Sequence, residues 1–235
     1  MISKNNISVL IPAAGLGQRS GLNYPKTLFK INKVPILVRI IKKIKKYDST
    51  PSIVINGKYQ KLFKKTLNDY SIKKFEFLNQ NLAIGMGDAV LKFKKSKFYN
   101  NSDHILLIWG DIPFIKKSSI DKLIKVHISE SNFMTLLSKY SSKPYTLIKK
   151  DKNNKIKEII ETKNSKMQFN YGERDIGIFI FKKSLLNYLH NQNIRKEHNF
   201  LYIIKKLYSN KFVVKSLPIA STKETISLNY LSDVK

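Results

Sequence analysis

The sequence predicts an α/β fold in which a mixed, mostly parallel sheet is flanked by helices and a strand-rich second half covers the substrate. Three observations support this prediction. Apolar runs of strand length alternate with amphipathic helical segments through residues 7–131. The run His104–Trp109 is apolar almost throughout, which is typical of a strand buried on both faces of a parallel sheet. From residue 132 onward, strand-like segments dominate. The expected architecture is therefore Rossmann-like.

The first half begins with a strand at residues 7–11, which Pro12 should end because proline has no amide proton to donate. The next helix has apolar residues on one face and Pro35 in its first turn. Further strands are expected at residues 52–55, 75–78 and 104–109, and helices at 35–47, 59–70, 85–93 and 118–131.

In the second half the sequence DKNNK, residues 151–155, predicts a turn between two strands. Strands are expected at residues 134–138, 145–149, 156–160, 176–181 and 211–217, and helices at 183–191, 200–208 and, as a short final element, 225–234. Since no internal repeat and no Pro/Gly/Ser linker is visible, we expect the 235 residues to form one domain.

Composition restricts the partners. The formal charge is +28, but only four of the 44 basic residues are arginine and the lysines are spread along the chain, which argues against nucleic acid as the partner. No apolar run approaches the roughly 20 residues that span a bilayer, so a membrane is not expected. The lack of cysteine and of a signal peptide favours the cytoplasm. Nothing in the sequence indicates an oligomeric state.

The segment AAGLGQR, directly after the first strand, predicts a cradle for a triphosphate. Small residues let the backbone approach a ligand, and successive N–H groups of such a loop can converge on phosphate oxygens. Arg19 adds a planar charged fork, and Lys26 places a point charge at the far lip of the loop. The predicted nucleotide contacts of the loop are Ala13, Ala14, Gly15 and Gly17.

Two further segments carry polar groups to the expected ligand edge of the sheet. Asp111 follows the strand at 104–109 and suits Mg²⁺, which commonly bridges protein carboxylates and substrate phosphates. An aspartate that merely forms a turn is the alternative. Gln80 could read a base edge with its amide, and Gly85 could let the base lie against the backbone. An ordinary strand-to-helix turn is the alternative there.

Together, AAGLGQR followed by PK, the segment from Gln80 through GMGDAV, and WGDIP resemble the sugar-phosphate nucleotidylyltransferases. The resemblance is greatest to the uridylyltransferase (pyrophosphorylase) domain that makes UDP-N-acetylglucosamine. It implies a Mg²⁺-dependent enzyme that joins a nucleoside triphosphate, first of all UTP, to a sugar 1-phosphate and releases pyrophosphate. Residues 1–131 would then bind the nucleotide and residues 132–235 the sugar phosphate.

The resemblance also implies roles for single residues. Arg19 and Lys26 would be catalytic, and Asn229 in the segment SLN would be a second metal ligand beside Asp111. Glu161 in IIETKN and Asp175 in DIGI would contact the sugar.

Three positions depart from the family pattern. Met86 replaces a hydroxyl residue, Thr146 replaces a glycine, and Asp175 replaces an asparagine that would hold an acetamido sugar. Three alternatives therefore stay open: a cytidylyl- or guanylyltransferase for another sugar or alcohol phosphate, a homologue that binds nucleotide without turnover, and, from a different class, a nucleic-acid-binding module.

Overall fold

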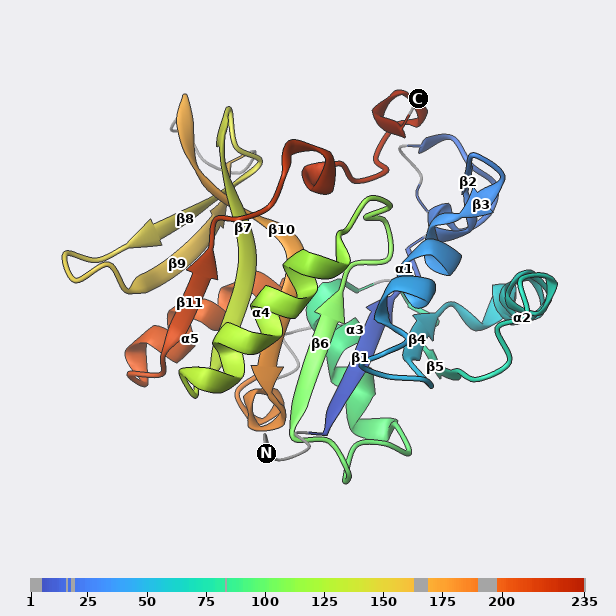
Figure 1. Cartoon of the computed structure of the whole chain (residues 1–235), viewed down its shortest axis with the longest axis horizontal. Helices are drawn as coiled ribbons and strands as arrows, with labels where there is room; N and C mark the ends of the chain where they lie inside the picture. Colours follow the sequence, from blue (N-terminus) through green and yellow to red (C-terminus); the bar gives the residue numbers. More distant parts are fainter. Residues whose placement is uncertain are drawn as a thin grey trace.

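The fold is built on a seven-stranded mixed sheet (Figure 1). The computed structural model describes residues 6–15, 17, 20–82, 84–162, 169–189 and 198–234. In spatial order the strands are β11 (Val214–Leu217), β7 (Met134–Ser142), β10 (Tyr171–Lys182), β6 (His104–Ile108), β1 (Ile7–Pro12), β4 (Ser52–Ile55) and β5 (Glu76–Asn79). All neighbours pair in parallel except that β10 runs antiparallel to both β6 and β7. The predicted mixed, mostly parallel sheet is confirmed.

Helices cover both faces of this sheet. The side chains of β6 alternate between two hydrophobic clusters, with Leu106 and Ile108 in one and Ile105 and Leu107 in the other. The first cluster includes residues of α1 (Ile36–Ile44), α2 (Gln60–Asp69) and α4 (Lys117–Ser129). The second includes residues of α3 (Met86–Leu91) and α5 (Ile203–Ser209). Burial on both faces explains why the strand sequence is apolar throughout.

Two short hairpins stand outside the main sheet. One pairs β2 (Lys30–Ile31) with β3 (Val34–Pro35), and the other pairs β8 (Thr146–Lys150) with β9 (Ile156–Glu161). In Figure 1 the second hairpin projects beside β7 and β10. Its turn forms because Asp151 accepts hydrogen bonds from the backbone N–H groups of Asn153 and Lys155, as DKNNK predicts. This hairpin brings Thr146 and Glu161 to one wall of the site described below.

Pro12 is the last residue of β1, as expected, and the bond beside its pairing with Val54 comes from Ala13 N, which donates to the carbonyl oxygen of Val54 at 2.7 Å. Some other expected elements are wrong. Residues 225–234 are not one helix, since the backbone at Ile226 is extended between two short turns. Of the helix expected at residues 183–191, the structure has the 3₁₀ element η6 (Lys183–Asn187), and residues 190 and 191 lie outside the described residues. The 3₁₀ elements that the structure describes include η2 (Lys26–Leu28), η3 (Gly57–Tyr59), η4 (Lys92–Lys95), η6 (Lys183–Asn187), η7 (Phe200–Tyr202), η8 (Thr222–Thr225) and η9 (Leu231–Val234).

Residues 218–234, which we call the C-terminal strap, run from β11 across the top of the sheet as seen in Figure 1. The buried Glu224 anchors the strap. One of its carboxylate oxygens accepts the N–H of Lys116, at the start of α4, at 3.0 Å, and the other accepts the N–H of Ser221 at 2.9 Å. Burial by itself raises the pKa of Glu224, but these hydrogen bonds outweigh burial and hold the pKa below its ordinary value. The strap is therefore fixed to α4 through an ionised carboxylate.

A buried histidine fixes α4 in turn. His127 on α4 contacts His104 Nδ1 through Nε2 at 3.0 Å and Thr135 Oγ1 through Nδ1 at 3.0 Å. Burial, with smaller contributions from the neighbouring His104 and Lys182, lowers the pKa of His127 to about 3. The neutral imidazole is therefore the form that the folded protein accommodates.

This histidine makes stability depend on pH. Because the pKa of His127 is lower in the folded chain than its ordinary value of 6.5, the unfolded chain binds more protons below pH 6.5. We expect the free energy of unfolding to fall by up to about 1.4 kcal/mol per pH unit below that value. Urea denaturation at about pH 7.5 and about pH 5 should show a loss larger by about 2 kcal/mol in the natural protein than in His127→Gln. Equal losses in both proteins would contradict the assignment.

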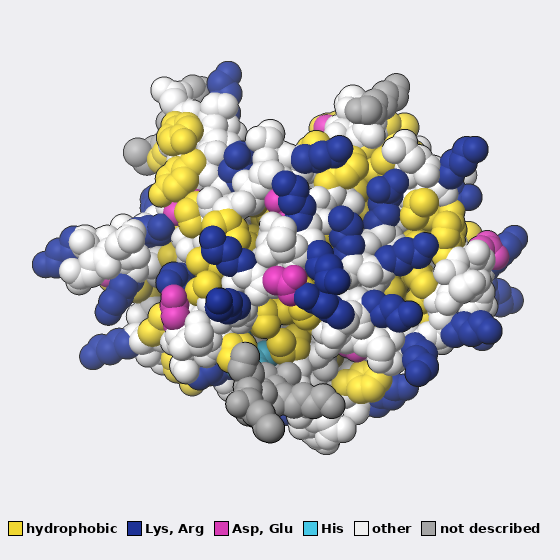
Figure 2. All heavy atoms as spheres, viewed as in Figure 1, with side chains coloured by type: hydrophobic (Ala, Val, Ile, Leu, Met, Phe, Trp, Pro, Cys, Tyr) yellow, Lys and Arg dark blue, Asp and Glu magenta, His cyan; other side chains and the backbone are white. Residues whose placement is uncertain are grey.

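Positively charged side chains are spread over the surface. In Figure 2, Lys and Arg side chains are distributed over the whole viewed face rather than in one stripe, and few acidic groups interrupt them.

In the residues that the structure describes, no helix is both long and apolar enough to cross a membrane.

Candidate functional site

Two cavities adjoin each other beyond the carboxyl ends of β1 and β6. The smaller has a volume of about 260 Å³ and is lined by the loop after β1, the start of α3 and the residues after β6. The larger has a volume of about 540 Å³ and is lined by β8, β9, β10 and the C-terminal strap. Both cavities are lined by Lys26, Met86, Trp109 and Asp111. Ligands of open α/β sheets bind at this edge, so the cavities occupy the position where a two-substrate site is expected.

The loop after β1 forms one wall of the smaller cavity. Ala13, Ala14 and Gly15 line it, and a Cβ on Gly15 would meet only open space. Gly17 does not line the cavity but packs against Lys26, whose Cβ would lie 3.0 Å from a Cβ on Gly17. Gly17 also has a φ of +62°, a conformation that glycine adopts without strain. Arg19, the other cation expected here, lies outside the described residues.

Asp111 lies where the two cavities meet. A Cβ on Gly110 would lie 2.5 Å from the carbonyl oxygen of Pro12, so only glycine lets the chain leave β6 this close to β1. Asp111 Oδ2 accepts a hydrogen bond from Lys26 Nζ at 2.5 Å. Its other oxygen, Oδ1, is buried and has no hydrogen-bond partner among the described residues. The structure thus brings together the lysine and the aspartate that the sequence places 85 residues apart.

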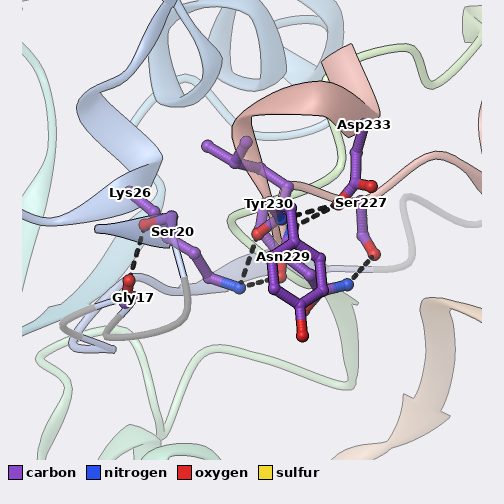
Figure 3. A network of polar contacts seen from close by, with 9 residues as sticks. Gly17, Ser20, Lys26, Ser227, Asn229, Tyr230 and Asp233 are labelled. Carbon is purple, nitrogen blue, oxygen red and sulfur yellow. Dashed lines mark hydrogen bonds and ion pairs between the residues drawn. The ribbon is translucent and has the colours of Figure 1, made fainter. Parts of the chain in front are cut away.

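The C-terminal strap completes this centre. Lys26 Nζ donates a second hydrogen bond to the carbonyl oxygen of Leu228 at 3.0 Å, and Leu228 N donates to the carbonyl oxygen of Asp111 at 3.0 Å. Figure 3 shows Lys26 extending from the loop towards the strap turn that carries Asn229. Asn229 Nδ2 donates to Ser227 Oγ at 3.0 Å, which orients the side-chain amide. Asp233 closes the turn by accepting the N–H of Asn229 at 2.9 Å.

The donor set of this centre fits a hard divalent cation. A buried carboxylate oxygen without a partner is unfavourable unless a ligand joins it, and Asp111 Oδ1 is such an atom. Asn229, on the strap beside it, can supply an amide oxygen, the other kind of ligand that Mg²⁺ accepts. In the described ranges no group of three or more His, Cys, Asp or Glu side chains could hold a metal. A cation here would therefore take its remaining ligands from substrate phosphates and water.

Gln80 and Gly85 lie on the far wall of the smaller cavity. The Gln80 side-chain nitrogen donates to the Gly85 carbonyl oxygen at 3.1 Å and to Asp88 Oδ2 at 2.8 Å, so only its amide oxygen remains for a base. Gly85 has a φ of +117°, and a Cβ there would lie 2.5 Å from the carbonyl oxygen of His198. The glycine is thus required for close packing against the His198 segment, a reason that the sequence did not reveal.

Asp175 and Glu161 line the larger cavity from β10 and β9. Asp175 is 3% exposed, and its two oxygens accept hydrogen bonds from Thr146 Oγ1 at 2.5 Å and from Gly177 N at 3.0 Å. Burial raises the pKa of Asp175, while these two bonds and the charge of Arg174 oppose the rise. Glu161 Oε1 accepts a hydrogen bond from Asn199 Nδ2 at 3.0 Å. Both predicted substrate residues therefore lie in one cavity.

The comparisons with known proteins agree with this geometry. Residues 9–174 match the family described as the MobA-like NTP transferase domain. The chain belongs to this family of nucleotidyltransferases.

Individual relatives show how far the likeness extends. The chain is 31% identical over 96% of its length to the bifunctional protein GlmU of Buchnera aphidicola subsp. Schizaphis graminum, of which it covers 49%. It is 28% identical to a probable UDP-N-acetylglucosamine pyrophosphorylase of Acanthamoeba polyphaga mimivirus, with 89% of this chain and 86% of that protein covered. The chain thus spans about half the length of the GlmU proteins it matches.

Solved structures confirm the fold. A putative glucose-1-phosphate thymidylyltransferase from Bacillus anthracis superposes with a TM-score of 0.75 at 19% identity, covering 91% of this chain and 87% of that one. The inositol-1-phosphate CTP transferase from T. maritima gives a TM-score of 0.75 at 16% identity, covering 99% and 93%.

Sequence reasoning missed several residues of this NTP transferase site. Arg174, Asn199 and Trp109 line the larger cavity, yet no spacing pattern in the sequence singles them out. Glu224 was missed as well, although the capping pattern from Ser221 to Glu224 was a readable signal. Sequence patterns do not reveal such residues, because their side chains meet only when distant segments of the chain fold together.

Proposed function

We propose that this NTP transferase joins a nucleoside triphosphate, UTP foremost, to a sugar 1-phosphate. An oxygen of the sugar phosphate would attack the α-phosphorus in line, the bond to the β-phosphate oxygen would break, and pyrophosphate would leave. The proposal rests on one observation. Asp111, with a paired and an unpaired carboxylate oxygen, lies where a cavity of about 260 Å³ meets one of about 540 Å³.

Each cavity suits one substrate. The smaller, lined by Ala13–Gly15, Gln80 and Gly85, would take the nucleotide, with loop amides facing its phosphates. The larger, lined by Glu161 and Asp175, would take the sugar phosphate, whose hydroxyl groups these carboxylates can bind. The division into a nucleotide half, residues 1–131, and a sugar-phosphate half, residues 132–235, is part of this proposal.

The chemistry requires positioning and charge rather than a protein nucleophile. Lys26, and Arg19 by analogy with the family, would neutralise the charge that develops on the transferred and leaving phosphates. Asp111 and Asn229 would hold Mg²⁺, which when bound polarises phosphate oxygens and adds positive charge between them. The net charge of +28 would draw anionic substrates toward the cavities. The cytoplasmic location expected from the lack of cysteine stays a prediction.

The decisive experiment is a panel of the four nucleoside triphosphates against several sugar 1-phosphates, read as pyrophosphate release with and without Mg²⁺. We expect turnover with UTP that disappears when EDTA removes the metal. Preference for CTP or GTP would replace the uridylyl assignment by another nucleotidyl transfer. Nucleotide binding without pyrophosphate release would indicate a homologue that has lost turnover.

A further inference from the structure

One wall of the larger cavity consists of hydrogen-bond acceptors. Thr146 begins β8 and Asp175 lies on β10, and each is 3% exposed. The backbone register of the hairpin pairs Thr146 with Glu161, which adds a second carboxylate beside that of Asp175. All three residues line the cavity. We call Thr146, Glu161 and Asp175 the acceptor wall.

In the part of the chain that the structure describes, three donors that contact this wall point their hydrogens at its carboxylates. A threonine hydroxyl has one hydrogen, and Thr146 donates it to Asp175 Oδ1 at 2.5 Å. The second oxygen of Asp175 accepts from Gly177 N at 3.0 Å, which supports the ionised form of the carboxyl. Asn199 Nδ2 donates to Glu161 Oε1 at 3.0 Å. Towards a ligand, the wall therefore presents carboxylate oxygens and a hydroxyl oxygen, which accept hydrogen bonds.

Other donors that line the same cavity include Trp109, whose buried Nε1 has no partner among the described residues, and Arg174, which is partly engaged elsewhere. Its Nε donates to the main-chain carbonyl of Asp175 at 3.3 Å, and its Nη2 donates to that of Thr225 on the strap at 3.5 Å. These bonds tie the guanidinium to main-chain carbonyls of β10 and the strap. A ligand carbonyl placed against the acceptor wall would face oxygen atoms and lose the hydrogen bond that it made with water, which is costly in a buried site.

We propose that the sugar phosphate used by this enzyme presents hydroxyl or ammonium groups to Thr146, Glu161 and Asp175, and that an N-acylated sugar is a poor substrate. This inference rests on the proposed function and specifies its substrate class. It also explains why Thr146 and Asp175 occur together. The hydroxyl of Thr146 satisfies a carboxylate that would otherwise be buried without that partner.

The test compares glucose 1-phosphate, glucosamine 1-phosphate and N-acetylglucosamine 1-phosphate at fixed UTP. We expect kcat/KM for one of the two unacylated sugars to exceed that for the acylated sugar by about 10-fold or more. Asp175→Asn keeps the shape and supplies an amide N–H donor, so it should shift this ratio toward the acylated sugar by about 10-fold. Thr146→Ser, which keeps the hydroxyl, should preserve the natural ratio.

Asp121→Asn is the matched control, because Asp121 is an exposed aspartate on α4 that pairs with Lys46, and neither residue is among those that line the cavities. It should leave both rate and ratio unchanged. Preference of the natural enzyme for the acylated sugar, or an unchanged ratio in a folded Asp175→Asn, would overturn the proposal. The fold of that variant is checked by circular dichroism.

Binding gives a second measurement that does not need turnover. Trp109 is the single tryptophan of the chain and lines both cavities, so its fluorescence can report each sugar phosphate directly. If no pair of substrates releases pyrophosphate, the proposed reaction fails, but the order of the three dissociation constants still tests the wall. Tighter binding of the acylated sugar phosphate than of both unacylated ones would overturn the proposed preference for unacylated sugars.

Discussion

Replacing Asp111 by asparagine is expected to lower kcat/KM for pyrophosphate release by about 1,000-fold or more. The amide keeps the volume of the side chain but removes the charge that pairs with Lys26 Nζ at 2.5 Å and that would hold Mg²⁺. An amide nitrogen would also face Lys26, another donor. The measurement is the initial rate as a function of Mg²⁺ concentration, with UTP and the preferred sugar phosphate.

The control for this prediction is again Asp121→Asn, which breaks an exposed lysine–aspartate pair and should keep the natural rate within about twofold. Circular dichroism should show that Asp111→Asn is folded, because the residue lies at the end of the sheet and not in its core. Natural activity in a folded Asp111→Asn would remove the metal role of this residue and with it the main support for the proposed reaction.

Replacing Glu224 by glutamine is expected to lower kcat by about 10- to 100-fold although the residue is not among those that line either cavity. The amide nitrogen would place a donor against the N–H group of either Lys116 or Ser221, which now donate to different oxygens of the carboxylate. A loosened strap would displace Leu228 and Asn229 from Lys26 and Asp111. Hydrogen exchange should become faster at Leu228 N, whose bond to Asp111 joins the strap to the site.

Two comparisons separate a positioning role from a merely structural one. Glu130→Gln changes an exposed glutamate that pairs with Lys215, and it should alter neither kcat nor exchange at Leu228. In Glu224→Gln we expect kcat to fall more than KM rises, since the groups that move are those at the reacting phosphates. A lower unfolding midpoint with unchanged kcat would mean that Glu224 only stabilises the fold.

Local patterns predicted the parts of the fold that local chemistry determines. The buried strand at His104–Trp109 and the turn at Asp151 were recoverable because apolar runs and a turn-forming aspartate act within a few residues. The conformation of residues 225–234 was not recoverable, and the helix expected there does not form, because Glu224 binds Lys116, 108 residues away, and long-range contacts override helical propensity at Ile226.

The residues of the site likewise include some whose positions the sequence predicted and some whose contacts it could not. The ends of β1 and β6 place Gly15 and Asp111 together because parallel strands align their carboxyl ends, so topology alone predicted that proximity. The contact between Thr146 and Asp175 depends on how the β8–β9 hairpin meets β10, which no local pattern specifies. Sequence reasoning therefore identified these two positions separately as departures and could not show that they form one hydrogen-bonded pair.

The C-terminal strap follows β11 along the chain, and so all seven strands precede it. A polypeptide cut by a protease after Leu217 would keep every strand of the sheet yet lose the carbonyl of Leu228 and the amide of Asn229. During synthesis on the ribosome, likewise, the sheet can assemble before these groups emerge. The groups proposed for catalysis on the strap are thus the last to join a sheet whose strands all precede them.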